Sequence, residues 1–485
     1  MTTRTTRPGL ALFLLAFSQF LTMVDYNIVY VALPHIGTGL DFPSQYLQWV
    51  VSAYAVGFGG FLLLGGRMVD YLGAKRIYLT GLVIYAVSSL IGGFAPVSAV
   101  LVAARLLQGL GGALLFPAVL ALIATSFEEG PQRNKAFAMW GMAGSVGLAG
   151  GAILGGVLTS LISWRAVFFV SVVFVAIIMA LSPAGIRPDS EQIRAHGFDL
   201  KAAVLVTAGV SLIVFALAAG PRMGWTNGIP MTALLVGAVL IALFFLTESR
   251  TANPLIPLRL LSNRALAVAM AVLFIFQTGL EGAYYVFTTY VQPVLGYSAM
   301  QAGLAFLPVT LASMIGSGKL APSFMERYGM RITLSAGMII NGLGIGLTAA
   351  VMVTDGSFLM LLPGSVIWGI GGGLVFVSVF ASAGSGVAPE SQGVAAAMAS
   401  TSQQVGGAVG LAVLVAIANS FFTGSYATAP VADIATGLRT AGLIAAGLLV
   451  LGGLAALLLK KDRPEPAVSA PLDAAELREP ETAKR

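Results

Sequence analysis

The sequence predicts an all-α integral membrane protein with fourteen transmembrane helices. Apolar runs of about 20 residues, each long enough to cross a bilayer as a helix, recur along the whole chain. Only 9% of the residues are charged, whereas soluble proteins carry about 25%. Lysine and arginine also gather in alternate connections between the runs. A membrane β-barrel is not expected, because its strands would show alternating hydrophobicity over segments of about ten residues.

The fourteen helices are expected to begin near the residues given at the end of this paragraph. The first run follows Arg4 and Arg7, as a signal peptide would, but it is longer than a signal core and contains Asp25. We therefore expect this helix to be retained. The expected starting points are Leu10, Tyr46, Ile77, Ser98, Ala136, Ala166, Leu200, Met231, Ala265, Met300, Ile332, Phe358, Ala395 and Thr440.

The distribution of basic residues predicts the orientation. An even number of helices places both termini on one side, and the loops and tails of that side hold 22 of the 26 Lys and Arg. Arg165, Arg222 and Arg439 fall on the other side, and Arg105 lies within a helix. By the positive-inside rule both termini are cytoplasmic, in a multi-pass protein of the inner or plasma membrane. The net charge of +6 then reflects topology and does not indicate nucleic-acid binding.

The order of helices and polar segments predicts a plan of six, two and six. Residues 1–188 form a first six-helix bundle, and residues 189–264 form a cytosolic connector with two linker helices. Residues 265–460 form a second six-helix bundle, followed by a disordered cytosolic tail at 461–485. A charged loop after the second helix, "GGRMVDYLGAKR", has a partial echo in "GKLAPSFMERYGMR" of the second bundle. Such internal repeats are typical of transporters with a central cavity.

Several motifs resemble those of one transporter family. The loop Gly66-x-x-x-Asp70-x-x-Gly73-x-Lys75-Arg76 is similar to the signature loop of the major facilitator superfamily, and "RLLQGLGGA" from Arg105 resembles its second motif. The segments "SWRAVFFV", "GFDLKAAVL", "YVQPVLGYSAMQAGLAFLP" and "GVAAAMASTSQQVGGAVG" extend the likeness over nearly the whole chain, to the fourteen-helix drug:proton antiporters of multidrug efflux and antibiotic resistance. The resemblance implies the major facilitator fold and alternating access, with the two linker helices peripheral. It also implies that the signature loop latches the two bundles on the cytoplasmic side, where the alternative is an ordinary basic loop.

Three charged residues lie within apolar runs. Asp25, Arg105 and Glu281 are expected in the outer half of the membrane, with Asp25 about 13 Å below a helix end at Pro34. A charge at such depth costs about 2.5 kcal/mol or more, so each should face a cavity or a partner. Burial and a neighbouring arginine act in opposite directions on the proton affinity of a carboxylate. We therefore expect protonation of Asp25 or Glu281 to compete with substrate and Arg105 to tune that competition; the alternative is a structural ion pair between Asp25 and Arg105.

Polar and aromatic residues near these charges are candidates for a substrate cavity. Aromatic faces attract organic cations, although tyrosines in membrane helices often serve only in packing. The candidates are Gln19, Tyr26, Asn27, Gln108, Gln277, Tyr284 and Tyr285.

The fifth helix carries a stripe of small residues. Gly147, Gly151 and Gly155, with Gly156 beside them, would allow another helix to approach closely. The stripe resembles the antiporter motif of the family, although ordinary helix packing or dimerisation would need the same residues. Ala152 stands where the family usually has proline, so no proline kink is expected here, which puts strict exchange in question.

The sequence thus predicts a proton-driven exporter of hydrophobic or cationic drugs, or of a secreted metabolite. A uniporter or a proton symporter for a small metabolite is the alternative. We expect no enzyme, no metal, no cofactor besides the proton gradient and no nucleic-acid partner, because the chain lacks cysteine and a phosphate-binding loop and its two histidines lie far apart. The expected partners are the bilayer and a small-molecule substrate of a monomeric protein; an accessory efflux protein is left open.

Overall fold

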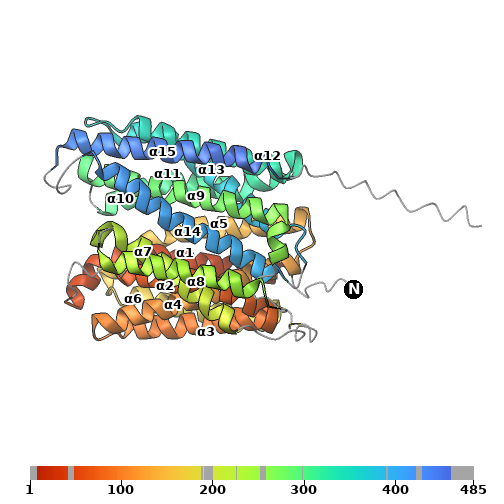
Figure 1. The fold of residues 1–485 in the computed structure, drawn as a ribbon. Coiled ribbons are helices and arrows are strands. Elements are labelled where there is room, and N and C mark those ends of the chain that lie inside the picture. Colours follow the sequence, from red (N-terminus) through yellow and green to blue (C-terminus); the bar gives the residue numbers. More distant parts are fainter. Residues whose placement is uncertain are drawn as a thin grey trace, which may run out of the picture.

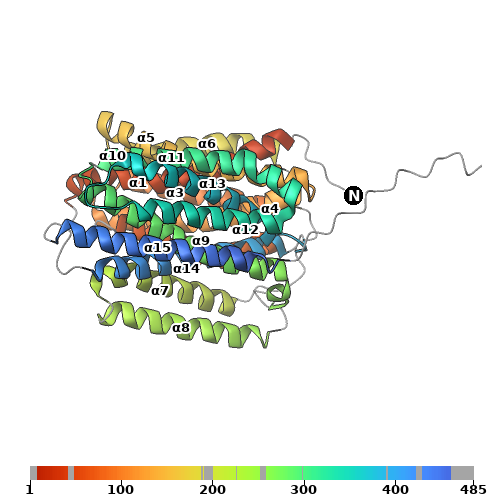
Figure 2. The same cartoon turned by 90° about the horizontal axis from the view of Figure 1, so that it is seen from above.

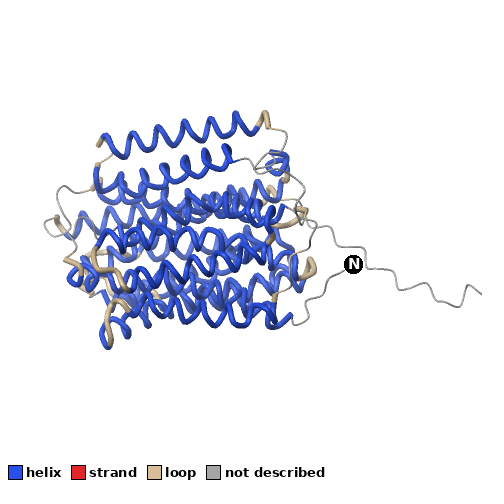
Figure 3. Tube along the Cα trace, turned by 90° about the horizontal axis from the view of Figure 1, so that it is seen from below, coloured by secondary structure: helices blue, strands red, loops and turns tan. Residues whose placement is uncertain are grey.

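The computed structural model is built from long helices that run side by side across a single bundle (Figure 1). The structure describes residues 8–41, 49–186, 189, 200–224, 227–251, 258–297, 299–388, 391–421 and 429–459. Within these residues every regular element is helical (Figure 3). This agrees with the predicted all-α class. The predicted tail at 461–485 and most of the connector after Asp189 lie outside the described residues.

The first six helices form one packed group. α1 packs against α5 and α6, while α4 lies between α2 and α3. α4 is the most enclosed of the six, because its "GLGGA" segment brings glycine backbones against α2 and α3. The helices are α1 (Pro8–Gly39), α2 (Trp49–Leu72), α3 (Ala74–Gly93), α4 (Ser98–Ser126), α5 (Pro131–Leu161) and α6 (Ala166–Gly185).

The next two helices form a pair at the edge of the bundle. α7 (Leu200–Met223) contacts α2, α14 and α8, whereas α8 (Gly228–Glu248) packs mainly on α7. Figure 2 shows α8 as the outermost helix on that side. Its exposed face carries Leu235, Val239 and Leu246, as expected for a surface in contact with lipid tails.

The remaining helices form a second packed group, in which α9 lies against α14 and α15, and α12 lies against α13 and α15. A short 3-10 turn (Leu258–Ser262) precedes this group, and π-helical turns occur at Tyr290–Val294 and Gly316–Leu320. The helices are α9 (Arg264–Thr289), α10 (Ala299–Ala305), α11 (Leu307–Ile315), α12 (Ala321–Ala350), α13 (Phe358–Ala383), α14 (Gln392–Asn419) and α15 (Val431–Ala456).

The described residues contain 12 helical segments that are long and apolar enough to cross a membrane. One of them, Gln301–Ala350, has 50 residues and contains Gly329 at φ 79° and ψ 166°, which is not a helical conformation. A positive φ of this kind is easily adopted by glycine. α7 contributes a shorter apolar stretch, Lys201–Leu217. The structure therefore confirms a multi-helix membrane protein, while the count of fourteen remains a prediction.

Two predicted helix ends are wrong. α1 continues through Pro34 to Gly39, so Asp25 lies about 21 Å from that end instead of about 13 Å, close to the middle of the helix. α15 begins at Val431, so Arg439 lies within a helix and not in the preceding loop. Arg439 is exposed on the surface of α15, where the long aliphatic stem of an arginine lets its guanidinium reach the polar boundary.

The first and second helix groups meet near the end at which α1 begins and α15 ends. We call this the basic end, because Arg67, Lys75, Arg76, Arg133, Lys135, Lys319 and Arg327 lie there. In the half of the bundle nearest this end, the Trp140 ring of α5 stacks on the Phe376 ring of α13, with centroids 5.1 Å apart. Phe116 of α4 meets Phe380 of α13 at 5.8 Å. These rings, with Phe137, form an aromatic plug between the groups; Trp140 is fully buried.

The same half of the bundle offers a site for a covalent cross-link. The Met142 β-carbon of α5 lies 3.6 Å from the position that a β-carbon would take at Gly318, and disulfides join β-carbons about 3.5–4.5 Å apart. The chain has no cysteine of its own. We expect Met142→Cys/Gly318→Cys to form a disulfide under mild oxidation, which would be measured as loss of labelling by a mass-tagged maleimide. The control pair Ser160→Cys/Gly318→Cys should stay labelled, because Ser160 lies about 27 Å further along α5; equal cross-linking of both pairs would contradict the described packing.

Candidate functional site

A buried ion pair lies inside the first six-helix group. An Nη1 of Arg105 on α4 donates to Oδ2 of Asp25 on α1 at 2.8 Å, and the two side chains are 1% and 0% exposed. Asp25 and Arg105, which the sequence analysis considered as a pair, are therefore in direct contact. A pair this deep in apolar surroundings needs further hydrogen bonds to offset the loss of hydration.

Four neighbouring helices supply those hydrogen bonds. Gln108 donates through Nε2 to Oδ1 of Asp25 at 2.8 Å and to the Ser89 hydroxyl of α3 at 2.9 Å. The Ser171 hydroxyl of α6 donates to the same carboxylate at 3.3 Å. Arg105 donates through Nε to the Val50 carbonyl of α2 at 2.9 Å, and its guanidinium carbon lies 4.6 Å from the centre of the Tyr54 ring. Helices α1, α2, α3, α4 and α6 thus converge on one charged centre.

The glycine stripe of α5 brings α1 to this centre. β-Carbons at Gly147, Gly151 and Gly155 would lie 2.7, 2.6 and 3.0 Å from backbone carbonyl oxygens of α1, at Phe20, Val24 and Ile28 respectively. The stripe therefore packs α5 directly onto the α1 backbone that carries Asp25.

One further hydrogen bond joins α1 and α5, and another lies within α5. Asn27 donates to the Leu148 carbonyl at 2.7 Å, which adds a polar tie between the helices. Gly156 accepts a hydrogen bond from the Ser160 hydroxyl of its own helix at 2.7 Å. α5 is one continuous helix through position 152, so the segment with alanine in place of the family's proline is helical throughout.

Glu281 lies apart from this pair, on α9 of the second group. Its Oε1 accepts a hydrogen bond from Gln277 at 2.8 Å, and Gln277 in turn accepts one from Gln403 of α14 at 3.1 Å. Tyr26 of α1 lies within electrostatic range of Glu281 and of Tyr284. Tyr26 also packs edge-on against Tyr30, with centroids 5.6 Å apart. Glu281 therefore belongs to a polar, aromatic cluster that spans both groups, which we call the Glu281 cluster (Tyr26, Tyr30, Gln277, Glu281, Tyr284, Gln403).

The other predicted cavity residues are distributed differently. Gln19 is 3% exposed, faces Gly144 of α5, and its Nε2 lacks a partner among the described residues. Tyr285 is partly buried next to Tyr284 on α9. Gln108 and Asn27 are engaged in hydrogen bonds within the first group, as described above.

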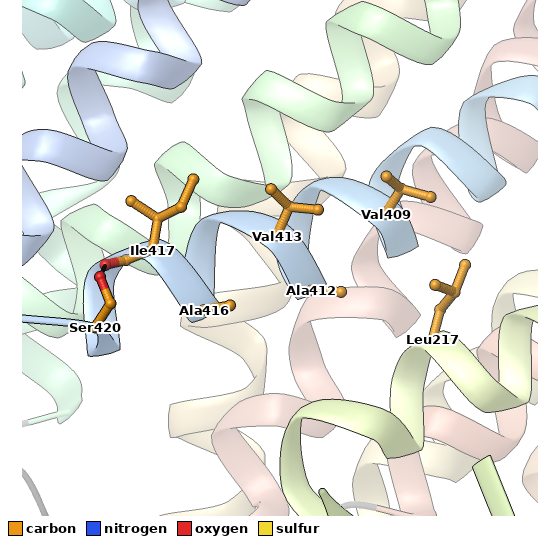
Figure 4. Close-up of a pocket in the computed structure, with 7 residues that line it drawn as sticks. All are labelled: Leu217, Val409, Ala412, Val413, Ala416, Ile417 and Ser420. Atoms are coloured by element: carbon orange, nitrogen blue, oxygen red, sulfur yellow. Dashed lines mark hydrogen bonds between the residues drawn. The ribbon is translucent and has the colours of Figure 1, made fainter. Parts of the chain in front are cut away.

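An apolar groove of about 430 Å³ lies between α14 and α7. Figure 4 shows its lining residues along one side of α14, with Leu217 of α7 facing them. None of the predicted cavity residues lines this groove. The lining consists of Leu217, Val409, Ala412, Val413, Ala416, Ile417 and Ser420.

The signature loop connects the two groups at the basic end. The Asp70 carboxylate accepts hydrogen bonds from the backbone N–H groups of Gly393 (2.8 Å) and Val394 (2.9 Å). These are among the first residues of α14, which has no side-chain cap of its own, and a carboxylate is favoured at the positive end of a helix dipole. Gly66 lies directly against Gly393 and Ala397, where a side chain would not fit. Lys75 donates through Nζ to the Ile186 carbonyl at the end of α6.

A model of the Major Facilitator Superfamily matches residues 15–411. The chain belongs to this superfamily. It shares the fold of the human organic anion transporter MFSD10 (TETRAN), with a TM-score of 0.67 at 15% identity, covering 92% of this chain and 99% of that one. Membership of this superfamily confirms the prediction of a membrane transporter.

Bacterial relatives are similar over most of their length. The cephamycin export protein CmcT of Amycolatopsis lactamdurans is 35% identical over 87% of this chain and 88% of its own. The puromycin resistance protein pur8 of Streptomyces alboniger is 34% identical over 95% and 92% respectively. The lincomycin resistance protein of Streptomyces lincolnensis is 34% identical over 90% and 89%.

Three features of the site were not predicted from the sequence. Ser89 and Ser171 complete the ion-pair network, but isolated serines in apolar helices carry no distinctive signal. The aromatic plug joins α4, α5 and α13, which no local pattern relates. Asp189 accepts hydrogen bonds from Lys75 N and Arg76 N, although it lies in a connector that the sequence marks only as polar.

Removal of one member of the ion pair should destabilise the protein strongly. We expect Asp25→Asn to lower the unfolding free energy by about 3 kcal/mol or more, because Arg105 is left buried without a counter-charge. The double variant Asp25→Asn/Arg105→Gln should lose less than the sum of the two single variants. Unfolding in detergent micelles would measure these differences. The control Glu129→Gln breaks the exposed Arg133–Glu129 pair and should change the unfolding free energy by no more than about 1 kcal/mol. Equal losses of stability in Asp25→Asn and Glu129→Gln would contradict the buried ion pair.

The glycine stripe offers a matched pair of substitutions on one helix. Gly151→Ala should cost about 1–3 kcal/mol, because the new β-carbon meets the Val24 carbonyl oxygen and α1 must shift. Gly150→Ala should be neutral or slightly stabilising, because its β-carbon would be 3.5 Å from the Phe20 ring and alanine favours helix more than glycine. Thermal unfolding of both purified variants would test this contrast. If Gly150→Ala is the more damaging change, the stripe does not contact α1 as described.

Proposed function

We propose that the protein is a proton-coupled exporter that moves antibiotics or similar small molecules out of the cell by alternating access. The observation that carries this proposal is the similarity, along most of the chain, to the cephamycin export protein and the puromycin and lincomycin resistance proteins. Two separate acidic sites, Asp25 with Arg105 and Glu281 with its cluster, support coupling to protons.

The chain crosses the membrane fourteen times in this proposal. Gly329 divides the long segment Gln301–Ala350 into two crossings, and α7, with 24 residues, adds one more to the twelve. Residues 1–188 and 265–460 form the two moving bundles, and residues 189–264 supply the peripheral pair. The basic end faces the cytoplasm, because loops rich in Lys and Arg are retained there.

The signature loop is the cytoplasmic gate in this proposal. Three contacts join the two bundles near the basic end: the hydrogen bonds of Asp70 to the start of α14, the close approach of Gly66 to Gly393, and the aromatic plug. The described state is then closed towards the cytoplasm. Loading of substrate from inside requires these contacts to separate, as in other rocking-bundle motions.

The two acids have unequal roles in this mechanism. Glu281 lies within range of Tyr26 on the opposite bundle, so its surroundings change when the bundles rock. Its protonation competes with substrate, whose cationic or aromatic parts the tyrosines of the Glu281 cluster contact. Gln19 and Tyr285 are additional contacts for polar parts of the substrate. Asp25 is enclosed within one bundle, and its pairing with Arg105 changes only when α1 moves.

Proton movement in everted membrane vesicles tests the proposal. A proton gradient is imposed, and puromycin, lincomycin, a cephamycin and simple lipophilic cations are added in turn while a pH-sensitive dye is monitored. We expect release of protons with at least one compound, loss of that release in Glu281→Gln, and a reduction of about tenfold or more in Asp25→Asn. Asp355→Asn is the control, because Asp355 is exposed at the end opposite the basic end.

The outcomes separate the alternatives. Uptake of labelled compound without proton movement would indicate a uniporter. Proton movement in the same direction as the compound would indicate a symporter. Proton release that survives in Glu281→Gln and Asp25→Asn would contradict both coupling sites while retaining the exporter.

A further inference from the structure

Asp189 caps a helix that is distant in the sequence. Its Oδ1 accepts a hydrogen bond from Lys75 N at 2.9 Å, and its Oδ2 accepts one from Arg76 N at 3.1 Å. These two N–H groups belong to the first turn of α3, whose preceding residue, Gly73, provides no side-chain cap. A carboxylate at this position satisfies donors that an uncapped helix leaves unpaired and opposes the positive end of the helix dipole.

Gly73 makes this contact possible. Its φ of 101° lies in a region that glycine adopts without steric cost. A β-carbon at this position would collide with the Asp189 carboxylate. Gly73 is therefore required both by the turn and by the close approach of Asp189.

The Asp189 contact is linked directly to the gate. Gly73 N donates to the Val69 carbonyl at 2.9 Å, and Val69 precedes Asp70, which caps α14 of the other bundle. Lys75, whose N–H binds Asp189, also donates through Nζ to the Ile186 carbonyl at the end of α6 at 2.6 Å. One short segment is thus fixed to its own bundle on one side and reaches the other bundle through Asp70.

We infer that Asp189 is a positioning residue of the cytoplasmic gate, which holds the turn between α2 and α3 in the conformation that presents Asp70 to the start of α14. This inference rests on the proposed role of Asp70 as a latch. Asp189 fixes the turn within one bundle, whereas the Asp70 contact forms and breaks between bundles. Loss of Asp189 weakens the latch without removing any group that touches α14.

The cross-link Met142→Cys/Gly318→Cys reports closure near the basic end and needs no transported compound. In proteoliposomes we expect Asp189→Ala to slow its formation by up to about fivefold, because a lost helix cap shifts the closed–open equilibrium by a factor of this order. Asp70→Ala should slow it at least as much. Asp189→Ala should add nothing in the Asp70→Ala background, since both residues act on one contact.

Two control variants keep the inference open to contradiction. Asp355→Ala removes an exposed aspartate at the opposite end and should leave the rate unchanged. Asp189→Asn keeps an acceptor oxygen and should give a smaller slowing; it replaces Asp189→Ala in the cycle if the alanine variant does not fold. An unchanged cross-linking rate in the Asp189 variants would overturn the positioning role. So would a double variant, Asp189→Ala/Asp70→Ala, that cross-links more slowly than Asp70→Ala by the full factor seen for Asp189→Ala alone. An unchanged rate in Asp70→Ala would overturn the gate itself. Neither result would contradict the proposed export of antibiotics, which the vesicle assay tests separately.

Transport kinetics add a readout that general destabilisation would not produce. A weaker latch raises the population open to the cytoplasm, so the apparent affinity for substrate on that side rises while the return step slows. For a compound that the vesicle assay identifies, Asp189→Ala should therefore lower both KM and kcat by about twofold or more. A fall in kcat at constant KM would contradict the inference.

Discussion

The buried ion pair of Asp25 and Arg105 is the constraint around which the first bundle is arranged. Neither charge is exposed, and each would be expensive to expose to hydrocarbon. Further hydrogen bonds to the two charges come from α2, α4 and α6, and α3 binds the Gln108 amide that contacts Asp25. Separation of these helices would break hydrogen bonds to a buried charge, which favours packing of the first bundle as a unit. The glycine stripe of α5 belongs to the same arrangement, because without it α1 could not bring Asp25 to this depth.

The basic end uses one kind of interaction for two purposes. Asp189 caps α3 within a bundle, and Asp70 caps α14 between bundles, each through two backbone N–H groups. Caps of this kind contribute about 0.5–2 kcal/mol, which is enough to favour a closed gate and small enough to be reversed during a transport cycle. The aromatic plug adds apolar contact behind the Asp70 latch. Flat ring surfaces can separate without leaving a buried charge unpaired, and this suits an interface that must open.

The sequence predicted much of the fold, because the bilayer requires long apolar helices and alternating basic loops. It misplaced the end of α1 and the start of α15, since proline at position 34 does not end the helix and Arg439 is tolerated on a helical surface. It identified Asp25, Arg105 and Glu281 because charges are rare in apolar runs. It could not identify Ser171 or Asp189 as partners, because a contact between residues more than one hundred positions apart depends on how the helices pack.

Tyr26 gives the ion pair a physical connection to the second bundle. Asp25 and Tyr26 are consecutive on α1, about 100° apart around the helix. Asp25 is bonded within its own bundle, whereas Tyr26, on another side of the helix, lies within electrostatic range of Glu281. A rotation or shift of α1 that moves Tyr26 also changes the Asp25–Arg105 geometry, because both residues are carried by one helix. The glycine stripe and the Asn27–Leu148 hydrogen bond keep α1 in close contact with α5. α1 is thus suited to transmit substrate binding or protonation in the Glu281 cluster to the Asp25–Arg105 ion pair. Among the described residues, every hydrogen bond given for this ion pair comes from the first bundle.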